Sequence, residues 1–197
     1  MSANRYFIDN ERNNVDHYNY YYFDNAFTED ELTKIHNTAN LYPKMAGTVV
    51  GDSEVVSDYR KSTVIWIPEE SKNMWLYNKI SDLANIANTQ MWNYDIWGYG
   101  DALQYTIYEG NGGHYDWHAD LGPKISNRKL SCVLQLSDAD DYEGGELQLN
   151  NGGGAVNIGK KKNRIVFFSS FVLHRVTPVT KGTRMSLVTW LSGKNLR

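Results

Sequence analysis

The sequence predicts a mainly β fold: a double-stranded β-helix (jelly roll, cupin-like) supported by helices from the N-terminal half. Two observations carry this prediction. Residues 1–100 contain two stretches with helical spacing of apolar residues, and from residue 101 onward short apolar runs alternate with Gly and Asn turns. Several short strands after two helices are typical of this architecture. We therefore expect one domain over residues 1–197, with helical support and a lid in 1–100 and the jelly-roll core in 101–191.

Two helices are expected in the N-terminal half. The first begins at a capping box, in which Thr28 is the N-cap residue and Glu31 lies three residues further on. Its apolar residues recur at helical spacing, and it should end before Pro43. The second helix should span about residues 70–91. The run Trp97-Gly98-Tyr99-Gly100 then interrupts the helical pattern.

The strands are expected to be short, because turn residues separate the apolar runs closely. Residues 62–67 form one candidate, and residues 150–154 (Asn-Asn-Gly-Gly-Gly) are a strong hairpin-turn signal. The candidate strands of the second half lie at residues 101–108, 114–118, 129–137, 145–150, 155–158, 164–169 and 184–191. Residues 1–20 are polar and should form a loose arm or an edge element. Residues 45–60 should form a mobile loop that serves as a lid.

Composition and charge exclude several classes of protein. The formal net charge is −3, and the only basic cluster is Lys160-Lys161-Lys162, which argues against a nucleic-acid partner. The single cysteine, Cys132, excludes an intramolecular disulfide framework and a cysteine-based metal cluster within one chain. We find no apolar signal core and no run long enough to span a membrane. We therefore expect a soluble cytoplasmic protein with no membrane partner; its oligomeric state is open.

Three side chains predict a metal site. His118 and Asp120 stand two residues apart, so on a strand they would point to the same face. A second histidine on a neighbouring strand, His174, would complete a three-ligand face. Two neutral nitrogens and one carboxylate suit iron(II) and leave three adjacent positions open. An isolated His-x-Asp pair is common and His174 alone would more often be structural, so the inference depends on what surrounds them.

An arginine supplies that context. Arg184 lies ten residues after His174, and Lys181-Gly182-Thr183 should form a turn that lets Arg184 begin the next strand. A guanidinium binds a carboxylate through two parallel hydrogen bonds. A dicarboxylate that chelates the metal through its 2-oxo acid end would therefore place its distal carboxylate at Arg184. An isolated arginine would instead be read as a surface residue at the start of a strand.

At this point the chain resembles the prolyl 4-hydroxylase branch of the iron(II)- and 2-oxoglutarate-dependent oxygenase superfamily. The similarity covers residues 101–191 well and the N-terminal half loosely. Its motifs are the run from Tyr108 through the glycine turn to His118-Ala119-Asp120, the strand at residues 128–137, the Gly144-Gly145-Glu146 turn, and the closing segment from His174 to Trp190. The resemblance implies that Fe(II), 2-oxoglutarate and O₂ are required, with ascorbate as an accessory reductant.

The resemblance also implies roles for individual residues. The three candidate ligands would hold the iron, and Arg184 would bind the distal carboxylate of 2-oxoglutarate. Tyr108 and Tyr115 would line the pocket near the iron, the cosubstrate and the substrate. Gln135 stands where the family has a cosubstrate tyrosine. Its amide could still donate a hydrogen bond to a carboxylate, although the pocket would differ.

The remaining carried-over residues concern the substrate groove. Arg128 and Trp190 match positions that face the substrate close to the reacting centre. Arg60 and Ser62 match positions along the peptide groove, and Asp101 matches a position where the family tends to carry an acidic residue. For the aromatic residues, packing in the core is an equally good interpretation.

The expected function is that of a dioxygenase that hydroxylates an unactivated C–H bond and releases succinate and CO₂. The resemblance favours 4-hydroxylation of a proline in a peptide or protein. One alternative is an oxygenase of the same fold that acts on another side chain, a free amino acid or a small metabolite. An alternative from a different class is a non-catalytic jelly-roll module that binds a metal. The residues leave the substrate open.

Overall fold

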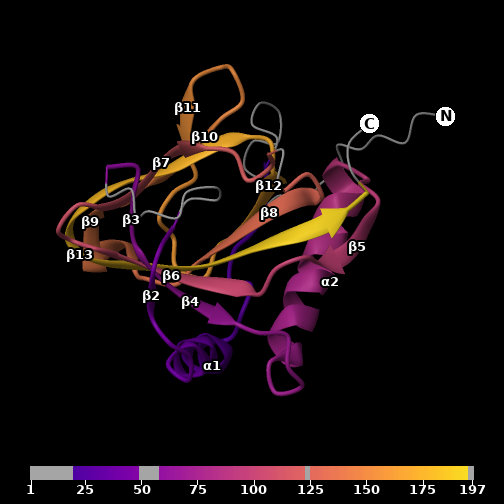
Figure 1. Cartoon of the computed structure of the whole chain (residues 1–197), viewed down its shortest axis with the longest axis horizontal. Coiled ribbons are helices and arrows are strands. Elements are labelled where there is room, and N and C mark those ends of the chain that lie inside the picture. Colours follow the sequence, from indigo (N-terminus) through magenta and orange to yellow (C-terminus); the bar gives the residue numbers. More distant parts are fainter. Residues whose placement is uncertain (1–19, 49–57, 123–124, 195–197) are drawn as a thin grey trace.

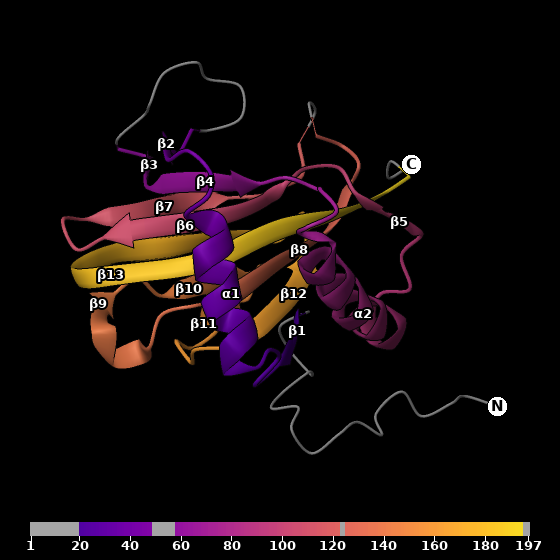
Figure 2. The ribbon, with the colours of Figure 1, turned by 90° about the horizontal axis from the view of Figure 1, so that it is seen from below.

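The computed structural model describes residues 20–48, 58–122 and 125–194, and the description that follows is confined to them. They form two packed β-sheets, with two helices against the outer side of the larger sheet (Figures 1 and 2). The helices are α1 (Glu29–Ala39) and α2 (Met74–Met91), and a short 3-10 helix spans Ala139–Asp141. The strands are β1 (Tyr20–Phe23), β2 (Met45–Ala46), β3 (Arg60–Lys61), β4 (Thr63–Ile67), β5 (Ile96–Tyr99), β6 (Leu103–Glu109), β7 (Gly113–His118), β8 (Arg128–Gln135), β9 (Tyr142–Gly144), β10 (Leu147–Asn150), β11 (Ala155–Asn157), β12 (Ile165–Ser169) and β13 (Leu173–Gly193).

One long strand, β13, belongs to both sheets. The major sheet has the order β1-β12-β8-β13-β6-β4-β2, with β5 also paired to β13. The minor sheet contains β3, β7, β10, β11 and β9, and its centre is the first half of β13. The pairing register of β13 shifts between Val176 and Val179 and again before Lys181, which marks irregular, bulged pairing. The strand therefore passes from one sheet into the other (Figure 2).

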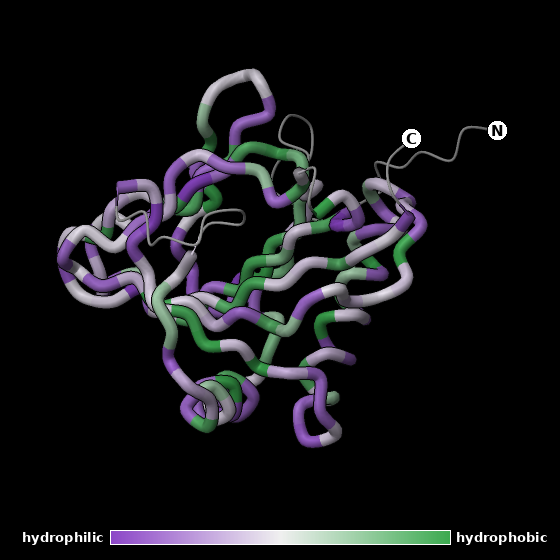
Figure 3. Tube along the Cα trace, viewed as in Figure 1, coloured by the Kyte–Doolittle hydropathy of each residue, from purple (hydrophilic) through white to green (hydrophobic). Residues whose placement is uncertain are grey.

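Alternation along the major strands separates two apolar cores. On β8, Leu130, Cys132 and Leu134 pack with the helices, whereas Val133 faces the space between the sheets. The same alternation on β12 places Phe167 in the helical core and Phe168 in the inter-sheet core. The strands that cross the middle of the molecule accordingly show hydrophobic residues interspersed with less hydrophobic ones, whereas the turn between β4 and α2 is hydrophilic (Figure 3). The inter-sheet space is where the functional side chains lie.

The first helix forms as its sequence predicts. Thr28 accepts a hydrogen bond from the backbone N–H of Glu31, and the Glu31 carboxylate accepts one from the backbone N–H of Thr28. This reciprocal pair satisfies donors that a helix start leaves free. Leu32 and Ile35 are then buried against the major sheet. The helix ends at Ala39, before Pro43, as expected.

Four element boundaries differ from the sequence prediction. The second helix begins at Met74 instead of near residue 70, because Asn73 folds residues 68–73 into a turn by bonding the carbonyls of Pro68 and Glu70. The Trp97–Gly100 run does not simply interrupt the chain, because residues 96–99 form β5 on the end of β13. Residues 142–144 form β9 where only a turn was expected. The final strand spans residues 173–193, not 184–191.

Two sequence predictions concern segments that lie partly outside the described residues. The N-terminal arm was assigned to residues 1–20, of which the structure describes only Tyr20, the first residue of edge strand β1. The lid was assigned to residues 45–60. The described parts are residues 45–48 and 58–60, which contain β2 and the start of β3, and both flank the inter-sheet cavity.

Candidate metal centre and cavity

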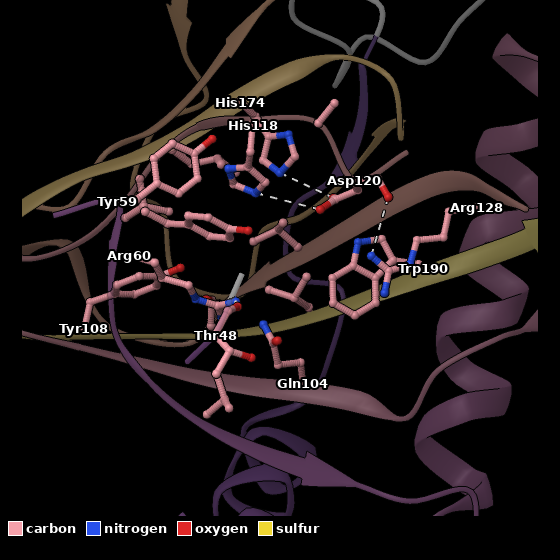
Figure 4. A pocket seen from close by; sticks show the side chains of 18 of the residues that line it. Thr48, Tyr59, Arg60, Gln104, Tyr108, His118, Asp120, Arg128, His174 and Trp190 are labelled. Carbon is pink, nitrogen blue, oxygen red and sulfur yellow. Dashed lines mark hydrogen bonds and ion pairs between the residues drawn. The ribbon is translucent and has the colours of Figure 1, made fainter. Parts of the chain in front are cut away.

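The structure brings the three predicted metal ligands together (Figure 4). His118 is the last residue of β7, and His174, the second residue of β13, lies directly opposite it in the sheet. Asp120 is not on the strand. It lies in a bend just beyond β7, where its backbone N–H donates to the carbonyl of Ser170. The same-face argument from strand periodicity is therefore wrong for Asp120, although the three side chains do converge.

The ligand atoms lie at separations that suit one small ion. Nε2 of His118 is 3.7 Å from Oδ1 of Asp120, and Nε2 of His174 is 3.3 Å from Oδ2. Three ligands at about 2.1 Å from a metal and at right angles to one another would be separated by about 3 Å. All three groups lie within 4.8 Å of one another. A modest contraction would thus place them on one face of an octahedral ion.

Backbone carbonyls orient both imidazoles. Nδ1 of His118 lies 2.7 Å from the carbonyl oxygen of Asp116, and Nδ1 of His174 lies 3.0 Å from that of Val172. A carbonyl only accepts, so each Nδ1 carries a proton and each Nε2 is the ring atom that faces Asp120 and would bind a metal. Partners of this kind fix the tautomer of metal-binding histidines in known sites.

The protonation states also suit a metal. Burial, together with the neighbouring His174, lowers the pKa of His118 to about 3, so this ring is neutral at neutral pH. Burial would raise the pKa of Asp120, but the two histidines and the hydroxyl of Ser131 hold it below its usual range, so the carboxylate is ionised. Burial would lower the pKa of His174, but the adjacent Asp120 carboxylate raises it above its usual value. Binding of a metal would displace any proton from Nε2 of this ring, which leaves a carboxylate with two imidazole nitrogens, the donor set that suits Fe(II).

Ser131 is a functional residue that the sequence reasoning missed. Its hydroxyl donates to Oδ2 of Asp120 at 2.6 Å, and its oxygen also lies 3.1 Å from the hydroxyl of Ser170. Ser131 is fully buried on β8 and points toward the inter-sheet space, two residues before Val133. Strand periodicity from Val133 or Gln135 would have placed it on the same face.

The three ligands open onto one cavity between the sheets, with a volume of about 680 Å³. Arg184 also lines this cavity, with its side chain almost completely buried (1% exposed). Its Nη2 donates to Oε1 of Gln135 at 2.8 Å and its Nη1 lies 3.3 Å from the hydroxyl of Ser186, but Nε has no partner. A buried guanidinium with a free donor is suited to bind an anion in the cavity.

Arg184 reaches this position by a route that differs from the predicted one. No turn separates it from His174, because Lys181 and Gly182 pair with β9 within the continuous strand β13. Gly182 has a positive φ of 72°, and a Cβ there would collide with the carbonyl of Asp141. The strand therefore continues past a glycine that permits close contact with β9.

Seven other predicted residues are distributed between the cavity and its supports. Tyr108, Tyr115, Arg128, Trp190 and Arg60 line the cavity. Arg128 stacks over the Trp190 ring at 3.7 Å and pairs with Asp101 at 2.9 Å. Ser62 accepts a hydrogen bond from Nε of Arg60 at 2.9 Å. Asp101 and Ser62 thus lie behind the two arginines and are not among the lining residues.

Gln135 likewise lies behind a lining residue. Its Oε1 accepts from Arg184, and its Nε2 faces the carbonyl of Gly159 at 3.5 Å. The side chain is not among those that line the cavity. The predicted contact between Gln135 and 2-oxoglutarate remains a prediction, and what the structure shows is a contact with Arg184.

Alternation along two strands identifies further lining residues. On β13 the cavity is lined by Arg184, Ser186, Val188 and Trp190, which follow one another at every second position. On β6 it is lined by Gln104 and Tyr108. Extending the period of two from the predicted residues would have found Ser186, Val188 and Gln104. The same period from Ser62 reaches Val64 and Trp66, which also line the cavity, whereas Tyr59 had no such signal.

These features define a class of protein: a double-stranded β-helix with a two-histidine, one-carboxylate metal centre and a buried arginine in the same cavity. Comparison with known proteins finds similarity to this class over the core of the chain. Residues 103–192 match the model of the 2OG-Fe(II) oxygenase superfamily. The resemblance to this superfamily deduced from the motifs is therefore confirmed over these residues.

Curated relatives match the same region. A PKHD-type hydroxylase from Teredinibacter turnerae is 38% identical over 87 residues, which cover 41% of this chain and 38% of the relative. A PKHD-type hydroxylase from Synechococcus is 40% identical over 81 residues, which cover 41% of this chain and 36% of the relative. The aligned region thus spans well under half the length of these relatives.

Solved structures confirm the jelly-roll fold over nearly the whole chain. A prolyl hydroxylase from Trichoplax adhaerens, in complex with a hypoxia inducible factor peptide fragment, superposes with a TM-score of 0.76 at 21% identity and covers 90% of this chain and 84% of its own. A prolyl-4-hydroxylase from Pseudomonas putida gives a TM-score of 0.71 at 18% identity, covering 91% and 95%. Within the described ranges of this chain, no helix is both long and apolar enough to cross a membrane.

Proposed function

We propose that this protein is an Fe(II)- and 2-oxoglutarate-dependent dioxygenase that hydroxylates a proline in a peptide or protein. One observation carries the proposal: His118, Asp120 and His174 converge at the wall of the same cavity that holds the buried guanidinium of Arg184. A metal site alone would be compatible with a structural ion. An arginine with a free donor in the same cavity adds the anchor that a chelating dicarboxylate needs.

Each group of residues around the cavity would have a separate role. The three ligands would hold the iron on one face, and Arg184 with Ser186 would bind the distal carboxylate of 2-oxoglutarate. Tyr115 stacks on the ring of His118 with centroids 3.5 Å apart, so it would hold that imidazole in place. Trp190 and Arg128 would form the wall that meets the substrate.

The bound iron, with 2-oxoglutarate and O₂, would supply the oxidising power: 2-oxoglutarate becomes succinate and CO₂, and one oxygen atom enters a C–H bond of the substrate. The protein contributes orientation and exclusion of water. Backbone carbonyls accept the Nδ1 protons of His118 and His174, so Nε2 of each ring is the atom that would bind the metal. The apolar lining from Val133, Leu147 and Val176 would keep solvent from the reacting centre.

A peptide substrate is supported by the shape of the site and by its neighbours. The cavity is lined from both sheets and from residues 45–48 and 59–60 at its edge, which leaves space for a segment of chain. The Trichoplax prolyl hydroxylase was solved with a peptide fragment. An oxygenase acting on a free amino acid or small metabolite and a non-catalytic metal-binding module are the competing possibilities.

Turnover tests the proposal directly. The purified protein, supplied with Fe(II), 2-oxoglutarate and ascorbate, should convert 2-oxoglutarate to succinate and hydroxylate proline-containing peptides, both measured by mass spectrometry. Arg184→Gln should raise the KM for 2-oxoglutarate by about tenfold or more, because a charged hydrogen-bonded pair contributes about 1.5–3 kcal/mol.

Arg175→Gln is the matched control for that variant. Arg175 is on the same strand but bonds Gln148 and stacks on Trp117, away from the cavity, so the KM should stay near the wild-type value. Succinate formation with no oxygen on proline would favour another substrate. Retained turnover in Asp120→Ala would contradict the assignment of the metal ligands.

A further inference from the structure

Several contacts fix the orientation of the Arg60 side chain at the edge of the cavity. Nε donates to the hydroxyl of Ser62 at 2.9 Å, and Nη1 donates to the carbonyl of Thr48 at 2.8 Å. The guanidinium lies over the Tyr115 ring at 4.4 Å. The side chain is only 6% exposed, and Nη2 is buried without a hydrogen-bond partner. Nε, Nη1 and one face of the guanidinium are thus in contact with other groups, and Nη2 is left without a partner.

Gly47 leaves the space that the Arg60 side chain needs in this orientation. A Cβ on Gly47 would lie 2.7 Å from Nε of Arg60 and would collide with the Ser62 hydroxyl. Gly47 also donates its backbone N–H to the carbonyl of Ser62 at 2.8 Å, which holds the two segments together. The close approach fixes the direction of the guanidinium. Figure 4 shows Arg60 beside Tyr108 on one side of the cavity, with Arg128 and Trp190 on the opposite side.

The described residues around the cavity supply no counterion for Arg60. Among the described residues that line the cavity, the arginines are Arg60, Arg128 and Arg184, and Asp120 is the single acid. Asp120 is engaged by the two histidines and Ser131. Arg128 is neutralised by Asp101. No carboxylate in residues 20–48, 58–122 and 125–194 forms an ion pair with Arg60, which is a costly state for a buried charge.

Binding of 2-oxoglutarate would not neutralise the positive charge of Arg60. A divalent ion with Asp120 would carry one net positive charge, and Arg184 adds a second. The two negative charges of 2-oxoglutarate would cancel these and leave the charge of Arg60 over. Burial raises the pKa of Tyr108, and the charges of both Arg60 and Arg184 oppose that rise, so Tyr108 lies within the field of both. By this count of charges, Arg60 stays available to bind a second anion.

We propose that Arg60 selects a substrate that carries a carboxylate close to the carbon that is hydroxylated. This inference rests on the proposed function and adds the chemical class of its substrate. Nη2 of Arg60 and Nε1 of Trp190, on opposite sides of the cavity, are both buried without a hydrogen-bond partner, and both require acceptors. The carboxylate would come either from an acidic side chain next to the target residue or from a terminal carboxylate, as in a free amino acid.

Matched probes separate these sources and test the proposal. The protein is loaded anaerobically with Mn(II) and 2-oxoglutarate, and both loading steps are measured by titration calorimetry. It is then titrated with three kinds of probe. The first are acetylated, amidated proline peptides that contain either Glu or Gln beside the proline. The second is a neutral proline peptide that ends in a free carboxylate or, as its partner, in an amide, and the third are L-proline and L-prolinamide.

At least one carboxylate probe should bind about tenfold or more tightly than its amide partner, which corresponds to about 1.4 kcal/mol. Arg60→Gln should abolish that preference, and Arg60→Lys should retain part of it, because the charge remains. Lys61→Gln is the control for net charge. It removes the neighbouring positive charge, which is exposed and bonds Asn111, and should leave the preference intact.

The outcomes distinguish this proposal from the proposed function. Failure of Mn(II) or 2-oxoglutarate to load would contradict the function itself. Normal loading with equal affinity for acid and amide, or with no binding of any carboxylate probe, would overturn the selection by Arg60 alone. A loss of 2-oxoglutarate affinity in Arg60→Gln comparable to that in Arg184→Gln would reassign Arg60 to the cosubstrate and overturn it as well.

Discussion

The proposed metal ligands depend on neighbours that orient them. Each histidine is oriented by a carbonyl two residues before it, Asp116 for His118 and Val172 for His174. The local conformation of the chain thus sets the tautomer, with no help from distant side chains. Asp120 has no such local partner for its carboxylate, and it is held instead by the hydroxyl of Ser131 from another strand.

Ser131 should therefore tune metal affinity. Ser131→Ala removes a 2.6 Å hydrogen bond to the ligating carboxylate, and we expect the dissociation constant for Mn(II) to rise by about 10- to 100-fold. Calorimetric titration of the protein without substrate measures this. Ser131→Thr keeps a hydroxyl and should recover much of the loss.

Ser137→Ala is the control for general loss of stability. Ser137 is equally buried and makes two hydrogen bonds, to the carbonyl of Thr183 and from the N–H of Met185, but it does not touch the ligands. The Mn(II) affinity of the Ser137→Ala variant should remain at the wild-type value, even if the variant unfolds at a lower temperature. Equal Mn(II) affinities for Ser131→Ala and wild type would remove Ser131 from the metal site.

At the scale of elements, ion pairs fasten the N-terminal segment to the core. Asp24 follows β1 and binds Arg164, just before β12, at 2.7 and 3.0 Å, and it also binds Lys161. Lys162 pairs with Asp138, and Lys160 donates to the carbonyl of Tyr142. The basic cluster that the sequence displays is thus used in internal contacts.

The pair between Asp24 and Arg164 predicts a pH dependence of stability. Hydrogen bonding from Arg164, opposed by burial and aided by Lys161, lowers the pKa of Asp24 in the folded protein. A folded pKa below the unfolded one stabilises the protein above about pH 4 and loses that effect as the pH falls through the folded pKa. Asp24→Asn should therefore cost about 1–3 kcal/mol at pH 7, and the cost should shrink below about pH 4.

Urea unfolding across this pH range provides the measurement. Asp138→Asn is the matched control, because the Asp138 side chain is 60% exposed and its pair with Lys162 should contribute little. A cost for Asp24→Asn that stayed constant from neutral to acid pH would show that the charge of Asp24 is not what stabilises the fold.

The elements that the sequence predicted well are those with local signals. The capping box located α1, and the Asn-Gly run located the turn between β10 and β11. The elements that were missed depend on distant partners. β9 is three residues long and exists because it pairs with β13, and β5 contains Gly98 yet pairs with the other end of the same strand. Neither carries a periodic apolar pattern of its own.

At the scale of the whole molecule, the site is assembled where one strand connects two sheets. β13 carries His174 in the minor sheet and Arg184 and Trp190 in the major sheet. The motif spacing indicated that these residues cooperate, and the structure shows why: a continuous strand lines the cavity from both sheets. The sequence could not predict the orientation of Arg60 or the hydrogen bond from Ser131 to Asp120. Both arise from contacts between segments that are separated in the chain.

The central claim is that three convergent ligands and Arg184 bind one iron and one 2-oxoglutarate in a single cavity. Anaerobic titration of the protein with Fe(II) and 2-oxoglutarate, followed by visible absorption, tests it most directly, because direct chelation of the iron by the 2-oxo acid produces a charge-transfer band. We predict a band that requires both components, saturates at one iron per chain, disappears in Asp120→Ala and needs more 2-oxoglutarate in Arg184→Gln. A wild-type protein that binds iron but develops no band with 2-oxoglutarate would contradict the account.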